Sequence, residues 1–419
     1  MRSRWLRLLC LSSAAILPLL AQETLAQLQA RARNLKSRGD AAGSLALWEK
    51  AAALDPRSAA IQDEIGFLLA VLNRRQEAIQ HLERAVALDP RLAVAHYHLG
   101  VAWWIEQDPN RAIPHLQSAV DLDPQSFDYR FHLGHALNET AHYSDALPHL
   151  QKAAALNPRH SETWNQLGLA RQNLGDSKGA VEAYEHAVTL DPHNLDARNN
   201  YGFMLVNTGR SAEGVAQFRK ILEADPSNNM ARVNIGFAHL QKAELDQAES
   251  DFREVIRRDP ASAIAHYDLA VALKQKDQLD AAKAELTRVL QLDPRLPDAH
   301  YTLGIIHWQD GDFADAAREM QAAISARPDY ADAYFMLGTT LKQNGDLDGA
   351  VTALRNAIRI DPANPGPYNT LGQVLRQKGD MEGSRQAFAQ GAGAKQKKED
   401  ELGKMLQGGA GASKTPSGK

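Results

Sequence analysis

Small and apolar residues recur at three- and four-residue intervals through residues 161–194, as they do along one face of a helix. The positions that carry this pattern are Trp164, Leu167, Gly168, Ala180, Tyr184 and Ala187. Gly175 and Asp176 separate the two groups, and Pro192 follows the second. Because Gly and Asp favour turns and proline cannot continue a helix, the segment predicts two helices joined by a short turn.

The same pattern repeats along the chain every 34 residues without an insertion. The period is marked by Pro56, Pro90, Pro124, Pro158, Pro192, Pro226, Pro260, Pro294, Pro328 and Pro362. Most of these prolines follow Asp, and Asn157 and Arg327 are the two substitutes. The fixed φ of proline suits the entry to a helix, so each proline marks the boundary between two helix pairs.

Two columns of small residues keep the same register as the prolines. The first contains Gly66, Gly100, Gly134, Gly168, Gly202, Gly236, Gly304, Gly338 and Gly372, with Ala32 and Ala270 in its gaps. The second contains Ala78, Ala112, Ala146, Ala180, Ala248, Ala282, Ala316 and Ala350, with Ser44, Gly214 and Ser384 as small substitutes. Since helices approach closely only where the side chains between them are small, the columns predict tightly packed pairs.

This period and residue spacing resemble the tetratricopeptide repeat (TPR) family. In the repeat at 161–194, Arg171 stands where the family pattern has an aromatic residue. The resemblance covers roughly residues 25–392. It implies an all-α chain, an α-solenoid forming a right-handed superhelix of about eleven helix pairs, held together by contacts between neighbours.

The expected array occupies residues 22–392, and its first and last pairs depart from the pattern as terminal caps do. The expected pairs span about 25–58, 59–92, 93–126, 127–160, 161–194, 195–228, 229–262, 263–296, 297–330, 331–364 and 365–392. Residues 393–419 are expected to form a charged helical extension that ends in a disordered tail rich in Gly, Ser and Lys.

Residues 1–21 do not fit the repeat and have the pattern of a secretory signal peptide. Its positive residues are Arg2, Arg4 and Arg7. An apolar run follows at 8–20, which is shorter than the roughly 20 residues of a membrane-spanning helix. We expect cleavage after Ala21, with Ala26 as the alternative site, and an uncleaved signal anchor is the competing interpretation. The mature protein is thus expected to be exported, periplasmic or secreted, without a stable membrane span.

Charge and cysteine content narrow the possible functions further. Cys10 is the single cysteine and leaves with the signal peptide, so the mature chain has no disulfide and no thiol nucleophile. Loss of the three arginines changes the formal net charge from −4 to −7, because no acidic residue leaves with them. A mildly acidic chain without a basic block argues against nucleic acid as a partner.

No pattern of catalytic residues is recognisable, so we expect a protein that is not an enzyme and needs no cofactor. Histidines are concentrated in the third and fourth repeats, where His98, His132 and His135 are weak candidates for metal ligands. The alternative is that they are ordinary polar residues on helix surfaces.

In TPR arrays the first helix of each pair lines a concave groove, so equivalent positions form rows along it. Aromatic and polar residues in these rows are Tyr97, Trp104, Phe131, Asn199, Asn234, Tyr267, Tyr301, Trp308 and Phe335. A row of amides includes Gln241, Gln275, Gln309 and Gln343. We expect these residues to bind a partner, because amides can hydrogen-bond an extended backbone and aromatic rings supply apolar contact. The alternative is that the rings pack against the next repeat and the amides are only solvated.

The function expected from the sequence is a non-enzymatic scaffold that binds extended protein segments in its concave groove. Residues 229–364 carry the richest combination of rings and amides. The amide row loosely resembles the asparagine ladder in the repeats of O-linked N-acetylglucosamine transferases, whose catalytic part is absent here. The alternative function is therefore an accessory subunit that recruits substrate to a separate glycosyltransferase or protease.

Export is the first testable prediction. N-terminal sequencing of protein recovered from the periplasm or medium should find a chain that begins at Gln22 or Gln27. A chain that remains in the cytosol and still begins at Met1 would contradict it.

Overall fold

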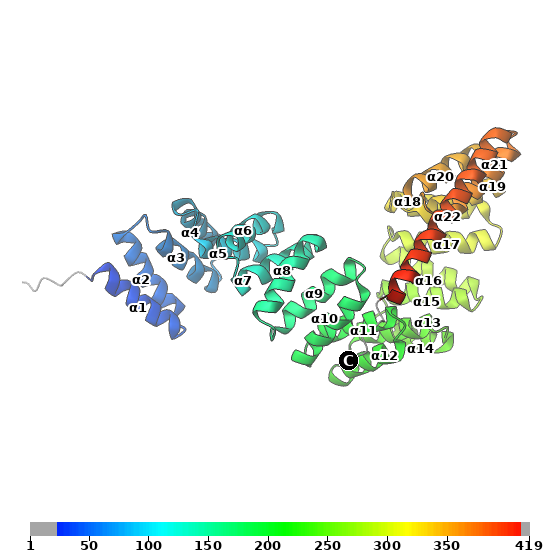
Figure 1. Cartoon of the computed structure of the whole chain (residues 1–419). Coiled ribbons are helices and arrows are strands. Elements are labelled where there is room, and N and C mark those ends of the chain that lie inside the picture. The colour runs from blue at the N-terminus through cyan, green and yellow to red at the C-terminus, as the bar shows by residue number, and fades with distance from the viewer. Residues whose placement is uncertain (1–22, 412–419) are drawn as a thin grey trace, which may run out of the picture. The chain divides into compact units, whose positions relative to one another are not determined.

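The computed structural model describes residues 23–411, with side-chain surroundings as far as residue 400. These residues form 22 helices and no strand (Figure 1). The helices follow one another as eleven pairs, which confirms the all-α solenoid. The expected signal peptide and residues 412–419 of the expected tail lie outside the described residues.

The helices of each pair have nearly constant lengths. The first helices have 13 residues each and are α1 (Leu25–Ser37), α3 (Ala59–Val71), α5 (Ala93–Ile105), α7 (Phe127–Glu139), α9 (Ser161–Asn173), α11 (Leu195–Asn207), α13 (Asn229–Gln241), α15 (Ala263–Gln275), α17 (Pro297–Gln309), α19 (Ala331–Gln343) and α21 (Pro365–Gln377). The second helices are α2 (Ala41–Leu54), α4 (Arg75–Leu88), α6 (Pro109–Leu122), α8 (Tyr143–Leu156), α10 (Ser177–Leu190), α12 (Ser211–Ala224), α14 (Leu245–Arg258), α16 (Leu279–Leu292), α18 (Phe313–Ala326), α20 (Leu347–Ile360) and α22 (Met381–Gly411).

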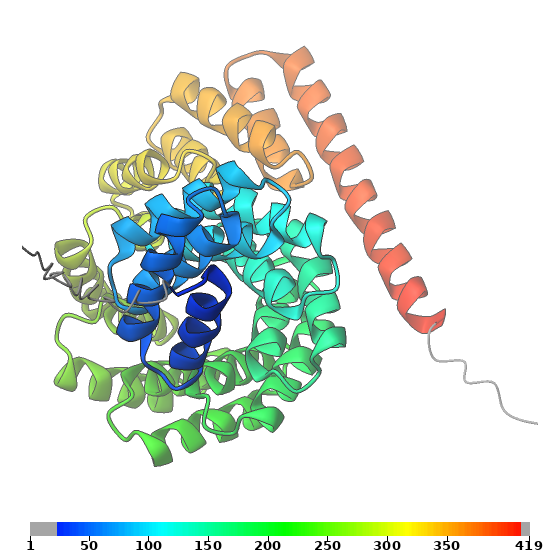
Figure 2. The ribbon, with the colours of Figure 1, turned by 90° about the vertical axis from the view of Figure 1, so that its left-hand side faces the viewer.

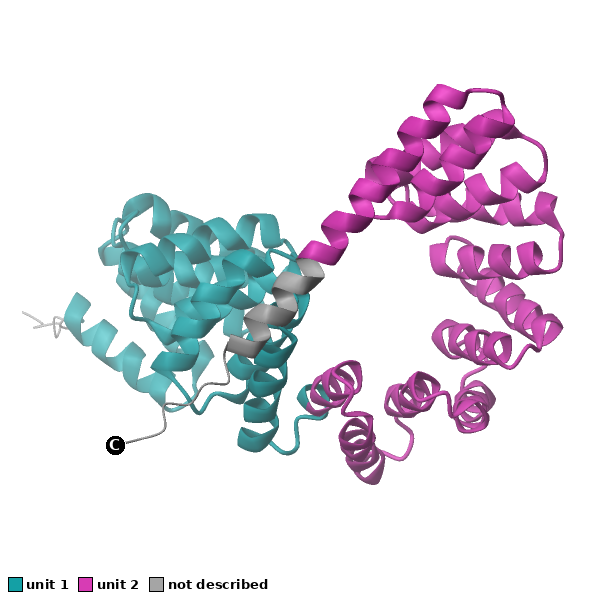
Figure 3. Ribbon diagram, turned by 45° about the vertical axis from the view of Figure 1, so that its right-hand side comes forward, with its two compact units in different colours: residues 1–197 teal, residues 198–419 magenta. Residues whose placement is uncertain are grey.

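The pairs group into two compact units (Figure 3). Unit 1 ends at Ala197 and contains α1 to α10, whereas unit 2 starts at Arg198 and contains α12 to α22. The boundary falls inside α11.

The turn inside each pair requires a residue with positive φ. Gly175, at the predicted break, has φ 80°, and five other pairs also use glycine at this place. The remaining five pairs use Asn73, Gln107, Ala141, Ala243 and Asp277, with φ between 56° and 61°. The turn is kept even where the residue is not glycine, so the packing of the two helices determines it.

The residue before each repeating proline, usually Asp, stabilises the turn between one pair and the next through its side chain. The Asp89 carboxylate accepts a hydrogen bond from the backbone N–H of Arg91, at 2.9 Å, across the intervening proline. Asn157 accepts the equivalent bond through its amide oxygen, at 3.3 Å. Arg327 has no acceptor to offer and instead donates to Asp298 of the same repeat, at 2.6 Å.

The glycine column is where the two helices of a pair meet. A Cβ atom built on Gly236 would lie 2.7 Å from the ring of Phe252 on the second helix, closer than two carbon atoms can pack. The other glycines of the column face a large side chain sixteen positions later in the same way, at 2.6–2.9 Å. The alanine column is fully buried beside them. The predicted tight pairs are therefore confirmed.

Apolar side chains form a series of local clusters rather than one core. In unit 1 one cluster links α6 to α10, and in unit 2 another links α13 to α17. Each cluster spans a few neighbouring pairs, so most of the stability of a helix comes from the pairs next to it.

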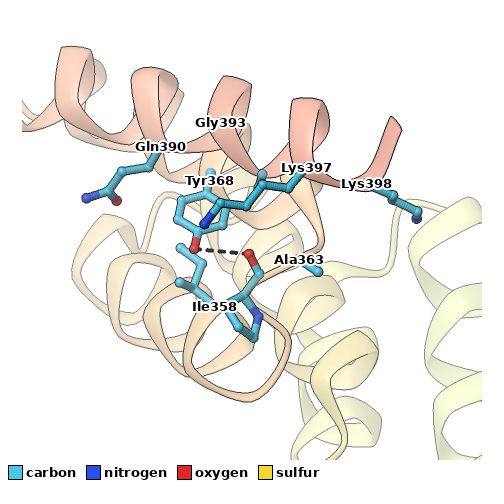
Figure 4. Close-up of a pocket in the computed structure, with 9 residues that line it drawn as sticks. Ile358, Ala363, Tyr368, Gln390, Gly393, Lys397 and Lys398 are labelled. Carbon is cyan, nitrogen blue, oxygen red and sulfur yellow. Dashed lines mark hydrogen bonds between the residues drawn. The ribbon is translucent and has the colours of Figure 1, made fainter. Parts of the chain in front are cut away.

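The last helix is unlike all others. With 31 residues α22 runs well beyond α21, against which its first half packs (Figure 2). Gly391 allows this approach, since a Cβ there would lie 3.0 Å from the Cβ of Tyr368. Figure 4 shows Lys397 and Lys398 farther along α22, beyond Tyr368. Among the described residues no helix combines the length and the apolar composition needed to cross a bilayer.

We predict that Gly236→Leu forces α13 and α14 apart. Overpacking of this kind costs about 1–3 kcal/mol. Because the contacts are local, the backbone amides of α13, α14 and their neighbours should lose protection against hydrogen exchange, while those of α1 to α4 keep it.

The matched control is Gly393→Leu, since a Cβ built on Gly393 would meet no atom within 4 Å beyond its chain neighbours and the adjacent backbone of α22. Unchanged protection of α13 and α14 in Gly236→Leu would show that the glycine contact does not set the spacing of the pair.

Candidate functional site

The first helices form the inner face of each unit. In unit 1 α3, α5, α7 and α9 contact one another in sequence, as do α13, α15, α17, α19 and α21 in unit 2. No second helix of the described residues contacts the next second helix of its unit. Successive first helices therefore lie closer together than successive second helices, so each unit curves toward its first helices. We call the exposed surface of the first helices the inner face.

Side chains on the inner face of unit 1 connect successive repeats. The imidazole Nδ1 of His98 lies 2.8 Å from the Asp63 carboxylate. The Tyr97 hydroxyl lies 3.4 Å from Nδ1 of His132, and the Trp104 indole donates to Glu139. Each of these contacts joins residues 35 positions apart, so the predicted Tyr97 and Trp104 both lie on this face.

Phe131 is less accessible than the sequence suggested. It is 8% exposed and packs between Phe127 and His160, with ring centroids 5.9 Å and 4.8 Å away. Both neighbours lie within residues 127–160, so the Phe131 ring is covered by its own repeat up to the N-cap of α9.

The three candidate metal-binding histidines have protein partners instead. His132 Nδ1 lies 2.8 Å from the backbone carbonyl of Asp128, and His135 Nε2 lies 3.3 Å from the Gln166 amide. The described residues contain no group of three His, Cys, Asp or Glu side chains placed to hold a metal ion. The rings of His132 and His135 instead meet the ring of Trp104 edge to face.

Burial changes the ionisation of this face. It raises the pKa of Tyr97 to about 12, with a contribution from the Asp128 carboxylate. Burial also lowers the pKa of His132 and of His135, so both rings are neutral at pH 7. The side chains of Tyr97, His132 and His135 are thus uncharged at neutral pH.

A hollow of about 310 Å³ lies between α3 and α5 on the inner face of unit 1. Its walls are Phe67, Ala70, Val71, Leu82, Tyr97, His98, Val101, Ala102 and Ile105. Val71 and Ile105 at its rim are 58% and 49% exposed. Ala70 is short where the equivalent residues Trp104, Leu240 and Trp308 are long, which explains why the hollow occurs here.

Sequence reasoning missed this hollow, although a signal was present. The amide row begins at Asn173 and runs through Gln241 to Gln377 at intervals of 34. Extended backward, the same row reads Glu139, Ile105 and Val71, so it turns apolar in the second and third repeats.

A larger hollow, of about 560 Å³, lies beside α22 at the end of the array. There the Tyr368 hydroxyl donates to the Pro362 carbonyl at 3.3 Å (Figure 4). The exposed Lys397 and Lys398 border the hollow, which continues no row of the inner face. We therefore place the candidate site on the inner faces.

The predicted aromatic residues of unit 2 are half-buried on its inner face. The Tyr267 hydroxyl lies 3.4 Å from that of Thr302, and the Tyr301 ring lies 5.0 Å from the ring of Tyr330. The Phe335 ring lies against Gly366 of α21. The indole N–H of Trp308 is buried without an acceptor among the described residues.

The predicted amides divide into two groups. The Asn234 amide donates to the Asn199 side chain at 2.7 Å, and Asn234 is only 8% exposed. Gln241, Gln275, Gln309 and Gln343, by contrast, are exposed and make no side-chain hydrogen bond to another described residue. Their donors and acceptors are free for water or a ligand.

Asp268 on α15 carries an unusual carboxyl group. It follows Tyr267 directly and forms no hydrogen bond or ion pair with another described residue. Burial raises its pKa to about 7. A carboxyl group without a partner in such a place favours the protonated form.

We predict that Asp268→Asn stabilises unit 2 more at about pH 8 than at about pH 5. The folded pKa lies above the ordinary value of about 3.9. Asp268 therefore does not lower the free energy of unfolding below about pH 4. Above that pH it lowers this free energy increasingly, until the pH passes the folded pKa. Each pKa unit corresponds to about 1.4 kcal/mol, so the gain at high pH should reach a few kcal/mol.

Denaturant unfolding at both pH values measures the gain, and the exposed Asp329→Asn in the same unit is the control. If the free energies of unfolding of Asp268→Asn and the unmodified chain differ by the same amount at both pH values, the pKa of Asp268 is not raised in the folded chain.

Comparisons with known proteins agree with this architecture. Models of the tetratricopeptide repeat match residues 64–127, 121–291, 301–365 and 341–408, and a TPR repeat model matches 272–311. No match was found among the curated proteins.

Two similar solved structures show the same fold. Yeast Tom70 is 14% identical with a TM-score of 0.51, and the match covers 92% of this chain and 95% of Tom70. A tetratricopeptide repeat protein from Parabacteroides merdae is 17% identical with a TM-score of 0.55, and covers 59% of this chain and 98% of its own. With repeat models matched from residue 64 to residue 408, the chain belongs to the tetratricopeptide repeat family.

Proposed function

We propose that this chain is a non-enzymatic scaffold that binds extended polypeptide segments on its inner faces. One observation carries the proposal. Four exposed glutamines without side-chain partners recur every 34 residues beside half-buried aromatic rings, from Gln241 to Gln343. A surface that repeats polar and apolar groups in one register suits a ligand whose own groups repeat, which an extended backbone provides.

The chemistry of the rows fits such a ligand. Each glutamine offers an acceptor and two donors, which can pair with the N–H and C=O of a backbone. Rings such as Tyr301 lose little conformational freedom on binding, because they are already held by their neighbours. In this proposal the amides orient the segment and the rings supply most of the affinity.

We place this activity outside the cytoplasm, on the basis of the signal-like pattern in residues 1–21. The capping box at Thr24 and Gln27 supports cleavage after Ala21, because cleavage after Ala26 would remove Thr24 from the start of α1.

The function is tested with a partner captured from the periplasm or medium and identified by mass. Tyr301→Ala or Trp308→Ala should weaken its binding by about 2 kcal/mol, roughly thirtyfold, as loss of an aromatic anchor does. Gln309→Ala should cost about 1 kcal/mol, since each amide bond replaces a bond to water. Titration calorimetry measures the affinities, and circular dichroism checks the fold.

Arg288→Ala on α16 is the matched control, since Arg288 is exposed on a second helix. If Arg288→Ala abolishes binding while the ring variants bind normally, the partner uses the outer face and the proposal is wrong.

A further inference from the structure

The hollow of unit 1 has the size and lining of a pocket for one bulky apolar side chain. Its volume of about 310 Å³ is twice that of a cavity of ~150 Å³, which is enough to hold a benzene molecule. Apart from the hydroxyl of Tyr97 and the imidazole of His98, its walls are apolar side chains. Burying a large apolar group there would also cover the exposed rim residues Val71 and Ile105.

His98 presents a hydrogen-bond acceptor at the wall of the hollow. Its Nδ1 lies 2.8 Å from the buried Asp63 carboxylate, which can only accept, so Nδ1 carries the hydrogen. In the neutral ring Nε2 is then an acceptor. It has no hydrogen-bond partner among the described residues.

Tyr97 presents a donor beside it. Nδ1 of His132 donates to the Asp128 backbone carbonyl at 2.8 Å, so this nitrogen cannot also accept the Tyr97 hydrogen. The hydroxyl hydrogen of Tyr97 is therefore available to a ligand. Neighbouring residues thus offer one donor and one acceptor, which is what the C=O and N–H of a peptide backbone require.

The surroundings of the hollow favour a cation in the ligand. Asp128 is exposed at the start of α7, and its carboxylate forms no hydrogen bond or ion pair with another described residue. It stands one turn before His132, whose Nδ1 lies 2.8 Å from the Asp128 carbonyl and whose ring centroid lies 5.3 Å from that of Tyr97.

Among the described residues near the hollow, no unpaired cation neutralises this charge. Arg75, which lies beside Ala70 and Ile105, is paired with Glu106 at 3.4 Å. Helix α5 has no Lys or Arg, and the single arginines of α7 and α9 donate to backbone carbonyls, of Pro124 and Gly179. Lys36, which lies over the Phe67 ring, is paired with Glu64 at 2.7 Å.

From this arrangement we infer that the hollow between α3 and α5 recognises a polypeptide segment with a bulky apolar residue next to a lysine or arginine. The apolar side chain fills the space left by Ala70, the backbone bonds to Tyr97 and His98, and the cation pairs with Asp128. The inference rests on the proposed function and deepens it, by naming the kind of segment that unit 1 selects.

The test uses random dodecapeptides displayed on phage and selected on the full chain. Enriched peptides should combine a bulky apolar residue with Lys or Arg one or two positions away. A synthetic peptide of the enriched sequence should bind Ala70→Leu about tenfold more weakly or worse, because the leucine fills the hollow. Asp128→Asn should weaken binding about threefold to tenfold, with less dependence on salt than the unmodified chain shows.

Two controls separate binding from folding. Leucine already stands at the equivalent place as Leu240, so Ala70→Leu is compatible with the repeat. Ala87→Leu adds the same atoms to an exposed position of α4, and Asp145→Asn removes a charge from the first turn of α8 in the same repeat as Asp128. Both controls should bind within about twofold of the unmodified chain.

The outcomes distinguish this inference from the proposed function. Enriched peptides that lack the apolar–basic pair, or that bind Ala70→Leu as tightly as the unmodified chain, overturn the inference. If those peptides are lost with Tyr301→Ala, the proposed function stands and only the hollow is wrong. If no peptide is enriched over a selection without protein, both are wrong.

Discussion

The contact between a glycine on the first helix and a large side chain sixteen residues later sets the geometry of nine of the eleven pairs, and Ala32 and Ala270 take the place of glycine in the other two. In the third pair Gly100 meets Leu116, and in the seventh Gly236 meets Phe252, with no room for a Cβ atom at either glycine. Because this contact recurs every 34 residues, successive pairs stack with nearly the same geometry. Residues at equivalent positions therefore reach equivalent places on the inner face.

This arrangement separates stability from recognition. The glycine and alanine columns lie between helices, so they are buried and constrained in size. The inner face takes no part in those contacts and can differ from repeat to repeat. One inner position reads Val71 and Ile105 in unit 1 but Gln275 and Gln309 in unit 2, on the same backbone. The two units can therefore carry different surface chemistry without a change of fold.

The fold was predictable from the sequence because its determinants are local and periodic. The prolines give the period, the columns of small residues give the contact surface of each pair, and both were confirmed. The turns were harder to recognise, because Ala141 and Asp277 adopt a positive φ without the glycine that would have marked it. There the packing of two helices outweighs the preference of a single residue.

The candidate site was less predictable, because its properties depend on neighbours far apart in the sequence. The position of Phe131 in its row predicts an inner-face residue, but Phe127 and His160 bury its ring. The hollow depends on one short side chain, Ala70, between two helices of different repeats. The raised pKa of Asp268 comes from burial, which the residue type does not show.

The central claim is that ligands bind to the first helices. Covalent surface footprinting of the full chain, alone and with its captured partner, tests it most directly, since modification of each side chain is read by mass spectrometry. The account predicts protection of inner-face residues such as Ile105, Tyr301 and Gln309, while Leu88 and Leu122 at the ends of second helices remain modified. Protection confined to second helices would contradict it.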